Sequence, residues 1–237
     1  MDKFPPYVFF LVVSQKEDSY KEEQINSRIK LILDNSVGLS KSRNIIIKNV
    51  ETKWLWIQDD DISLNFKEFE QLLSLLKGEV SDAVFIKVLS CENTAEYYKS
   101  YTFHKKHSLL NALKISSIEI LVNVDFIKKN KITFNEKLGL GTNMPCCEEN
   151  KFVLDIFKES ESVSYFDVAP CSHTTLIENR NIDHEKRFVA RGYFLHYLPV
   201  YISSILLLRW AWNIRCDLTL SKKLSLMLKS YSRCLFS

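Results

Sequence analysis

The sequence predicts an α/β fold in which a mainly parallel sheet is flanked by helices and followed by a C-terminal helical appendage. Two observations lead to this class. Apolar, β-rich stretches alternate with helical patterns at first, and the chain looks helical from Asp183 to near its end. The 237 residues are 46% hydrophobic and 26% charged, so a substantial core can form. We expect two domains, residues 1–180 and residues 181–237.

The first predicted elements surround a turn at Gly38. The stretch YVFFLVVSQ (residues 7–15) is nearly all apolar, which suits a parallel strand that is covered on both faces. A polar stretch, EEQINS, separates it from RIKLIL (residues 28–33), which alternates like a second strand. Ser40 is a suitable N-cap for a helix that continues to about Val50.

The next elements continue the alternation of strands and helices. KWLWIQ predicts a strand, and Asn65 can cap a helix whose leucines, Leu72, Leu73, Leu75 and Leu76, face inward and which Gly78 closes. The remaining predicted elements are a strand at 82–90, a strand with a short helical turn at 115–130, a loop at 132–150, a helix at 151–160 and a short strand at 162–170.

Charge and hydropathy exclude some function classes. A net charge of +3 does not indicate nucleic-acid binding, although Lys and Arg outnumber Asp and Glu from Arg180 to the C-terminus. The uncharged stretch from Tyr197 to Leu208 is shorter than the ~20 residues that span a bilayer. We therefore expect an amphipathic helix that packs on the domain or lies on an anionic membrane surface.

The N-terminus and the cysteines predict a cytoplasmic protein. MDKFPPYVFFLVVSQ lacks the basic start and the small-residue cleavage site of a signal peptide. None of the six cysteines makes a CxxC pair, so we do not expect a structural zinc site. We expect free thiols, including the adjacent Cys146 and Cys147, which could form a disulfide only with strain.

The most informative stretch is TKWLWIQDDDISLN (residues 52–65), in which an apolar run ends in three aspartates. Ligands of open α/β sheets bind beyond the carboxyl ends of the strands. Side-chain alternation points Asp59 and Asp61 the same way, where their charges repel unless a cation binds. Such oxygen ligands suit Mg²⁺ or Mn²⁺, which complete their shell with substrate phosphates. The simpler alternative is a solvated turn.

Two other segments place charged groups beside helix starts. In GLSKSRN, a helix start favours phosphate, and Arg43 can pair bidentately with an anion. In FNEKLGLGTNMPCCEENKF, two glycines allow close approach of the backbone to a ligand, and Glu148 and Glu149 stand just before a helix that begins near Lys151. One of these acids can serve as a general base. A surface arginine and acids that stabilise a helix dipole are the simpler alternatives.

A fourth segment, APCSHTT, places His173 after a short strand. A neutral imidazole there could be a third ligand for the cation. The alternative is a structural histidine.

These segments in this order resemble the family 2 inverting glycosyltransferases of the GT-A fold, particularly the bacterial enzymes that build capsule, O-antigen or other surface polysaccharides. The resemblance runs from about Ile29 to Gly192. GLSKSRN…IQDDDI is similar to the family's GLS-x-x-RN segment and its DxD-type motif. SSIEI, FNEKLGLGT and EENKF resemble a later block, and VARGYFLHYLP resembles the start of the C-terminal helices.

The resemblance implies a role for each matching residue in a nucleotide-binding sheet. Asp59 and Asp61 match the metal-binding DxD, and His173 lies where some relatives place a third metal contact. Asp59 alternatively contacts the ribose of the nucleotide, and Arg43 matches a position that contacts the nucleotide. The implied cofactor is a divalent metal, Mn²⁺ or Mg²⁺.

The resemblance also implies the reaction. Glu149 matches the catalytic base, and Glu148 supports the acceptor or orients that base. The implied enzyme moves a sugar from a nucleotide-sugar donor to a polysaccharide or lipid-linked acceptor, with inversion of configuration. It would lie in the cytoplasm or peripherally on the cytoplasmic face of the inner membrane.

Two departures from the family pattern leave alternatives open. FFLVVSQKEDSY is similar to the family's second strand. One alternative is that the family's first strand and its helix are missing. The other is that this strand has taken over the role of the first strand, with Ser14 and Gln15 near the nucleotide base. Cys147 stands where relatives commonly have Gly. The alternatives are a degenerate relative that acts as an inactive or partner subunit, and a metal-dependent phosphatase or nuclease.

Overall fold

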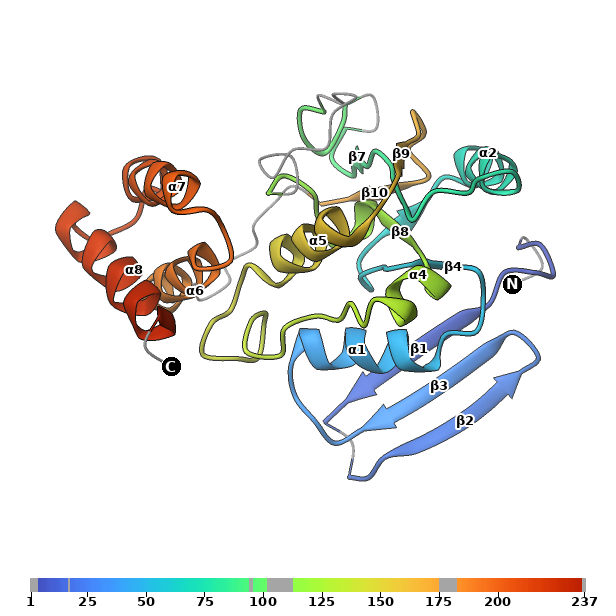
Figure 1. The fold of residues 1–237 in the computed structure, drawn as a ribbon. Helices are drawn as coiled ribbons and strands as arrows, with labels where there is room; N and C mark the ends of the chain where they lie inside the picture. Colours follow the sequence, from blue (N-terminus) through green and yellow to red (C-terminus); the bar gives the residue numbers. More distant parts are fainter. Residues whose placement is uncertain (1–3, 17, 94–95, 102–112, 175–182, 236–237) are drawn as a thin grey trace.

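A computed structural model describes residues 4–16, 18–93, 96–101, 113–174 and 183–235 (Figure 1). The predicted α/β class is confirmed, because sheets packed between helices form the larger part and three helices follow at the C-terminus. The sheets are mixed, however, and not mainly parallel as predicted.

The first sheet is formed by the N-terminal strands β1 (Phe10–Gln15), β2 (Lys21–Asn26) and β3 (Ile29–Asp34), in the order β1-β3-β2. β1 is parallel to β3, as predicted, whereas β2 is antiparallel to it. β2 corresponds to the polar EEQINS, whose polarity suits an edge strand in water. The prediction that β1 is covered on both faces is wrong, because Val12 is 48% exposed.

The helix α1 (Leu39–Asn49) follows this sheet. Its N-cap is Gly38, which has a φ of 133°, and not Ser40 as predicted. Ser40 lies inside the first turn, where it is fully buried and its Oγ donates a hydrogen bond to the Leu138 carbonyl at 2.6 Å. The hydroxyl that suggested a cap therefore binds a distant loop.

The central sheet has the order β4-β8-β6-β9, formed by β4 (Trp54–Trp56), β6 (Ala83–Phe85), β8 (Ile120–Asn123) and β9 (Val163–Tyr165). β8 is antiparallel to both of its neighbours, and β9 is parallel to β6. The Ile86 N–H donates to the Glu119 carbonyl at 3.1 Å, so the chain re-enters β8 from the end where it left β6. β8 therefore runs antiparallel to β6, whereas the simple alternation of strands and helices predicts parallel strands.

A small third sheet has the order β5-β10-β7, formed by β5 (Ser63–Leu64), β7 (Leu89–Ser90) and β10 (Cys171–His173). The strand predicted at 82–90 is thus divided between two sheets. β10 pairs antiparallel with β5, which begins two residues after Asp61. This pairing brings the segment that contains His173 close to the triple aspartate.

Helices cover both faces of the central sheet. α2 (Phe66–Leu76) packs on one face through Phe69, Leu72 and Leu76, with Asn65 as its N-cap as predicted, but Leu75 is exposed. α1, α4 (Val124–Lys129) and α5 (Glu148–Glu159) pack on the other face together with the core residues of β4, β6 and β8. The 3₁₀ helix η1 (Ser117–Glu119) leads directly into β8.

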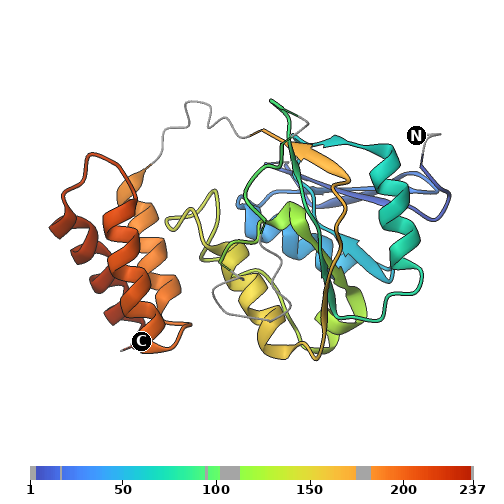
Figure 2. The ribbon, with the colours of Figure 1, turned by 90° about the horizontal axis from the view of Figure 1, so that it is seen from above.

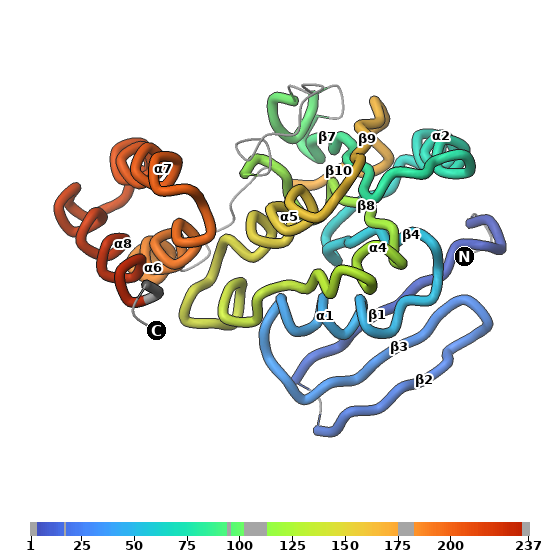
Figure 3. Tube along the Cα trace, in the orientation of Figure 1, coloured from blue at the N-terminus to red at the C-terminus, as the bar shows by residue number. Residues whose placement is uncertain are grey.

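The C-terminal helices are α6 (His184–Leu195), α7 (Val200–Asn213) and α8 (Leu220–Leu235). They lie side by side, apart from the sheets and nearest to α5 (Figures 2 and 3). One buried cluster joins Leu138 and Leu154 to Phe194 and Leu195 of α6. The predicted domain boundary at 180/181 lies outside the described residues, so the division into two domains stays a prediction. Within the described residues, no helix is sufficiently long and apolar to cross a bilayer.

Gly192 lets α6 and α8 pack at short range, and replacing it tests this packing. A Cβ atom there would lie 2.3 Å from the carbonyl oxygen and 2.7 Å from the Cα of Met227. Because both contacts are to backbone, we expect Gly192→Ala to lower the free energy of unfolding by about 1–3 kcal/mol. Urea unfolding followed by circular dichroism measures the change. Gly78→Ala is the control, since nothing lies within 4 Å of its added methyl group, and equal stability of both variants would contradict the prediction.

Candidate active site

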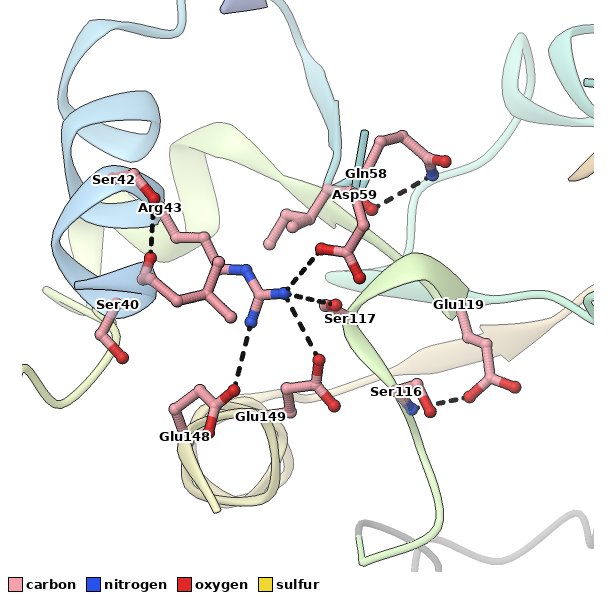
Figure 4. Close-up of polar contacts among 12 residues, drawn as sticks. Ser40, Ser42, Arg43, Gln58, Asp59, Ser116, Ser117, Glu119, Glu148 and Glu149 are labelled. Atoms are coloured by element: carbon pink, nitrogen blue, oxygen red, sulfur yellow. Dashed lines mark hydrogen bonds and ion pairs between the residues drawn. The ribbon is translucent and has the colours of Figure 1, made fainter. Parts of the chain in front are cut away.

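The guanidinium of Arg43 lies at the centre of the site (Figure 4). Arg43 is only 3% exposed, and its Nη2 donates to Asp59 Oδ1 at 3.0 Å and to Ser117 Oγ at 2.8 Å. Glu149 Oε1 lies 3.4 Å from the same Nη2, and Glu148 Oε1 lies 3.8 Å from Nη1. One buried cation therefore joins α1, the end of β4, η1 and the first turn of α5.

Backbone contacts hold the start of α1 in place. Gln15 at the end of β1 pairs with Gly38 in both directions: its Nε2 donates to the Gly38 carbonyl at 3.0 Å, and the Gly38 N–H donates to its Oε1 at 3.3 Å. The Leu39 N–H donates to the Leu140 carbonyl at 2.9 Å. Ser14 precedes Gln15 in β1. The predicted nucleotide contacts of Ser14 and Gln15 stay predictions.

The two loop glycines pack against protein atoms. Gly139 has a φ of 101°, and a Cβ atom there would lie 2.9 Å from Ser40 Oγ and 3.2 Å from Glu148 Cγ. Gly141 has a φ of 85° and lies against the backbone of Gly38. Both positions need glycine, because the backbone conformation is unfavourable for other residues and the space is filled. The loop thereby locks α1 against α5.

The acid pair lies within α5, not before it. The helix begins at Glu148 and not near Lys151 as predicted, because Cys147 is the N-cap residue. Burial, and secondly the charge of Glu149, raise the pKa of Glu148 to about 7. Glu148 is buried, whereas the Glu149 side chain is 28% exposed. Of the two acids, Glu149 is therefore the one that a group from solvent can reach.

Asp59, Asp61 and His173 form a second cluster, in which one ligand atom from each lies within 4.8 Å of the others. His173 Nδ1 is 2.7 Å from the Thr174 carbonyl, which can only accept, so Nδ1 carries a proton. Nε2 faces Asp61 Oδ1 at 3.1 Å. In the neutral ring this would place a lone pair against a carboxylate, so the pair needs either a second proton or a cation. Two carboxylates and one imidazole are a donor set that could hold a divalent cation.

Four residues that the sequence analysis missed, Ser117, Glu119, Lys99 and Tyr101, form hydrogen bonds that hold the η1 side of the site in place. Ser117, which binds Arg43, lies in a capping box formed by Ser116 and Glu119. Glu119 is buried and accepts hydrogen bonds from Lys99, at 2.5 Å, and from Tyr101. The S-x-x-E pattern at 116–119 is the signal that could have found Ser117, since it marks a fixed turn. Nothing in the sequence pattern indicates that Lys99 and Tyr101 reach Glu119.

Comparison with known proteins identifies the family. Residues 16–147 match the sequence model described as glycosyl transferase family 2, which is more than half of the chain. The chain belongs to glycosyl transferase family 2. The match includes Arg43, Asp59 and Asp61 and ends one residue before Glu148. No curated protein matches the chain.

Solved structures of S. aureus TarS have the same fold. TarS 1-349 superposes with a TM-score of 0.53 at 18% identity over 88% of this chain. TarS 1-349 in complex with UDP-GlcNAc gives a TM-score of 0.54 at 17% identity over 88%. The chain spans 55–57% of these structures and 33% of TarS. The comparison supports the GT-A type of α/β fold that the sequence predicted.

The raised pKa of Glu148 predicts how stability depends on pH. The folded state holds this proton up to about pH 7, and the unfolded state loses it near pH 4.5, so stability falls as the pH rises through this window. Glu148→Gln removes this dependence, which amounts to about 3 kcal/mol. Urea unfolding between pH 4.5 and pH 8 measures it, with Glu70→Gln, exposed on α2, as the control. Identical pH profiles of wild type and Glu148→Gln would contradict the assignment.

Proposed function

We propose that this protein is a glycosyltransferase that moves a sugar from a nucleotide-sugar donor to a polysaccharide or lipid-linked acceptor with inversion of configuration. The observation that carries the proposal is that Arg43 binds Asp59 of the cation cluster and Glu149 of the acid pair with the same nitrogen atom. Family membership and the TarS complexes with UDP and with UDP-GlcNAc support it. UDP-sugars are therefore the first donors to test.

Asp59, Asp61 and His173 would hold a divalent cation, Mn²⁺ or Mg²⁺, on the donor side. When bound, such a cation neutralises the charge of the diphosphate leaving group. The aspartates are partly exposed, so they can meet a ligand from solvent. The hydrogen bond to Thr174 keeps Nε2 of His173 directed at Asp61.

Glu149 would act as the general base. Its carboxylate removes the proton from the acceptor hydroxyl while that oxygen attacks the anomeric carbon on the face opposite the diphosphate. This single displacement inverts the configuration, and a positioned base contributes ~10²–10⁴-fold to the rate. Glu148 carries a proton at and below about pH 7, so it removes a negative charge from beside the base.

Arg43 would orient the base and the donor side together. Its Nη1 is buried and makes no hydrogen bond to any described residue, although Glu148 lies 3.8 Å away. A buried donor without an acceptor is costly, and the acceptor closest to Nη1 in the described site is the Glu148 carboxyl, which is itself buried. These contacts argue against the inactive-subunit alternative, since Arg43 joins the proposed base, Glu149, to Asp59 of the cation cluster.

The proposal is tested by separating donor binding from transfer. We expect Asp61→Ala to lose Mn²⁺-dependent binding of UDP-GlcNAc or another nucleotide sugar in calorimetry. The control Asp60→Ala should retain it, because Asp60 is exposed and is not part of the cation cluster. Glu149→Gln should keep donor binding and lose transfer by ~10²–10⁴-fold.

Two results would overturn these roles. If Glu149→Gln transferred sugar at the wild-type rate, Glu149 would not be the base. If no nucleotide sugar bound to the wild type with Mn²⁺ or Mg²⁺, the inactive-subunit alternative would take the place of the proposal.

We further propose that α7 lies on an anionic lipid surface. Tyr201, Ile205, Leu208 and Trp212 are 61–76% exposed, and at 100° per residue they fall within an arc of about 60°. Residues 183–237 contain nine Lys and Arg against three Asp and Glu, whereas the whole chain carries only +3. An exposed apolar stripe with Tyr and Trp on a basic segment suits the headgroup region of a membrane.

Vesicle sedimentation tests this contact. We expect the protein to sediment with vesicles that contain anionic phosphatidylglycerol and to stay in the supernatant with neutral phosphatidylcholine. Ile205→Ser combined with Leu208→Ser should reduce the bound fraction at least several-fold, because both side chains lie on the stripe. Val80→Ser is the control, since Val80 is exposed but lies after α2. Equal binding of the double variant would show that α7 does not make the contact.

A further inference from the structure

Cys146 and Cys147 place two thiols side by side immediately before the acid pair. Their Sγ atoms lie 3.7 Å apart, within sulfur hydrogen-bond distance. Cys147 is buried, and Cys146 is half-buried at the loop surface. Two sulfurs at this separation are close enough to bind one soft ion together.

The backbone at Cys147 is in a conformation that its residue type disfavours. Its φ of 74° is in the left-handed region, where glycine is the usual residue. The same residue is the N-cap of α5, directly before Glu148 and Glu149. Strained residues persist where the surroundings hold them, and they gather at functional sites. A ligand that pulls on the Cys147 sulfur therefore acts on the start of the helix that carries the acid pair.

The surroundings favour a thiolate at Cys146. The hydrogen bond from the Cys147 thiol, together with the positive charges of Arg191 and Arg187, lowers the pKa of Cys146. The pKa of Cys147 is raised by the same hydrogen bond and by burial. In its protonated form, the Cys146 thiol can donate to the Arg187 carbonyl of α6, which lies 3.7 Å from its Sγ. Because Cys146 is the more exposed of the two, its sulfur is the one that a ligand from solvent meets first.

We propose that Cys146 and Cys147 form a chelating site for soft, thiophilic ions of the trivalent arsenic type, and that occupation of this site displaces the first turn of α5. Thiolates are the ligands that soft ions prefer. With an organoarsenic(III) dihydroxide, each sulfur forms one As–S bond, both As–OH bonds break, and the two thiol protons leave in two water molecules. The site is distinct from the cation cluster, and the proposal does not depend on the transfer reaction.

Phenylarsine oxide is the probe that tests the site. We expect one equivalent to bind to the full-length wild type, to be located on the peptide containing residues 146 and 147 by mass spectrometry, and to resist excess glutathione but not excess ethanedithiol. Cys146→Ser and Cys147→Ser should each weaken binding by ~10²–10⁴-fold, because a chelate loses its effective concentration. Cys91→Ser is the control, since Cys91 is exposed on a different segment.

Amide hydrogen exchange tests the coupling to α5. We expect the bound probe to speed exchange in the peptide that covers residues 148–152 of the wild type, and to leave that peptide unchanged in Cys147→Ser. Retention of tight binding by either single-cysteine variant would overturn the chelating site. Unchanged exchange in the occupied wild type would overturn the displacement of α5. Both readouts are independent of whether the protein transfers sugar.

Discussion

The burial of one positive charge, Arg43, among carboxylates is the constraint on which the rest of the structure depends. A guanidinium at 3% exposure is tolerated only with partners, and these come from segments more than 100 residues apart in the chain. Asp59, Ser117 and Glu149 must therefore stay within reach of its Nη2. Two further contacts hold α1 and α5 at this distance from each other: Gln15 pairs with Gly38, and Gly139 packs closely against Glu148. Removing this cation would take away the positive charge that Asp59 and Glu149 share.

Much of the fold could be predicted because it follows local patterns. Asn65 caps α2 as expected, and the alternation of apolar stretches with helices gave the α/β class. Strand direction could not be predicted, because it depends on where the chain re-enters the sheet, as Ile86 and Glu119 show. The prediction of Ser40 as the N-cap of α1 was wrong for a related reason. Ser40 has the chemistry of an N-cap, but its hydroxyl binds Leu138, and no local pattern contains that partner.

The candidate site shows the same division. The sequence analysis singled out the paired aspartates, Arg43 and the two glutamates because each has a charge at a predicted strand end or helix start, and the structure brings these side chains close together. Their contacts were not predictable in detail: Arg43 binds the side chains of Asp59 and Ser117, and its predicted contact with a nucleotide stays a prediction. Ser117 was missed because a serine carries no charge, and its hydroxyl binds Arg43 only because folding places the two residues together. The sequence pattern therefore identifies the charged residues, whereas the residues that each of them contacts are known only from the folded structure.

The charge of the site explains why three consecutive aspartates can end a buried strand. Asp59, Asp61 and Glu149 are three acidic side chains of the site, and burial, and secondly the charge of Glu149, raise the pKa of Glu148 to about 7. Arg43 compensates one of the negative charges, and His173 meets Asp61 with a nitrogen that needs a proton or a cation. These three acids exceed the one guanidinium by two charges, which a single divalent cation would balance in the proposed function. Like charges at short range are stable only when they are neutralised, so this excess of acidic groups favours the binding of a divalent cation, as the proposed function requires.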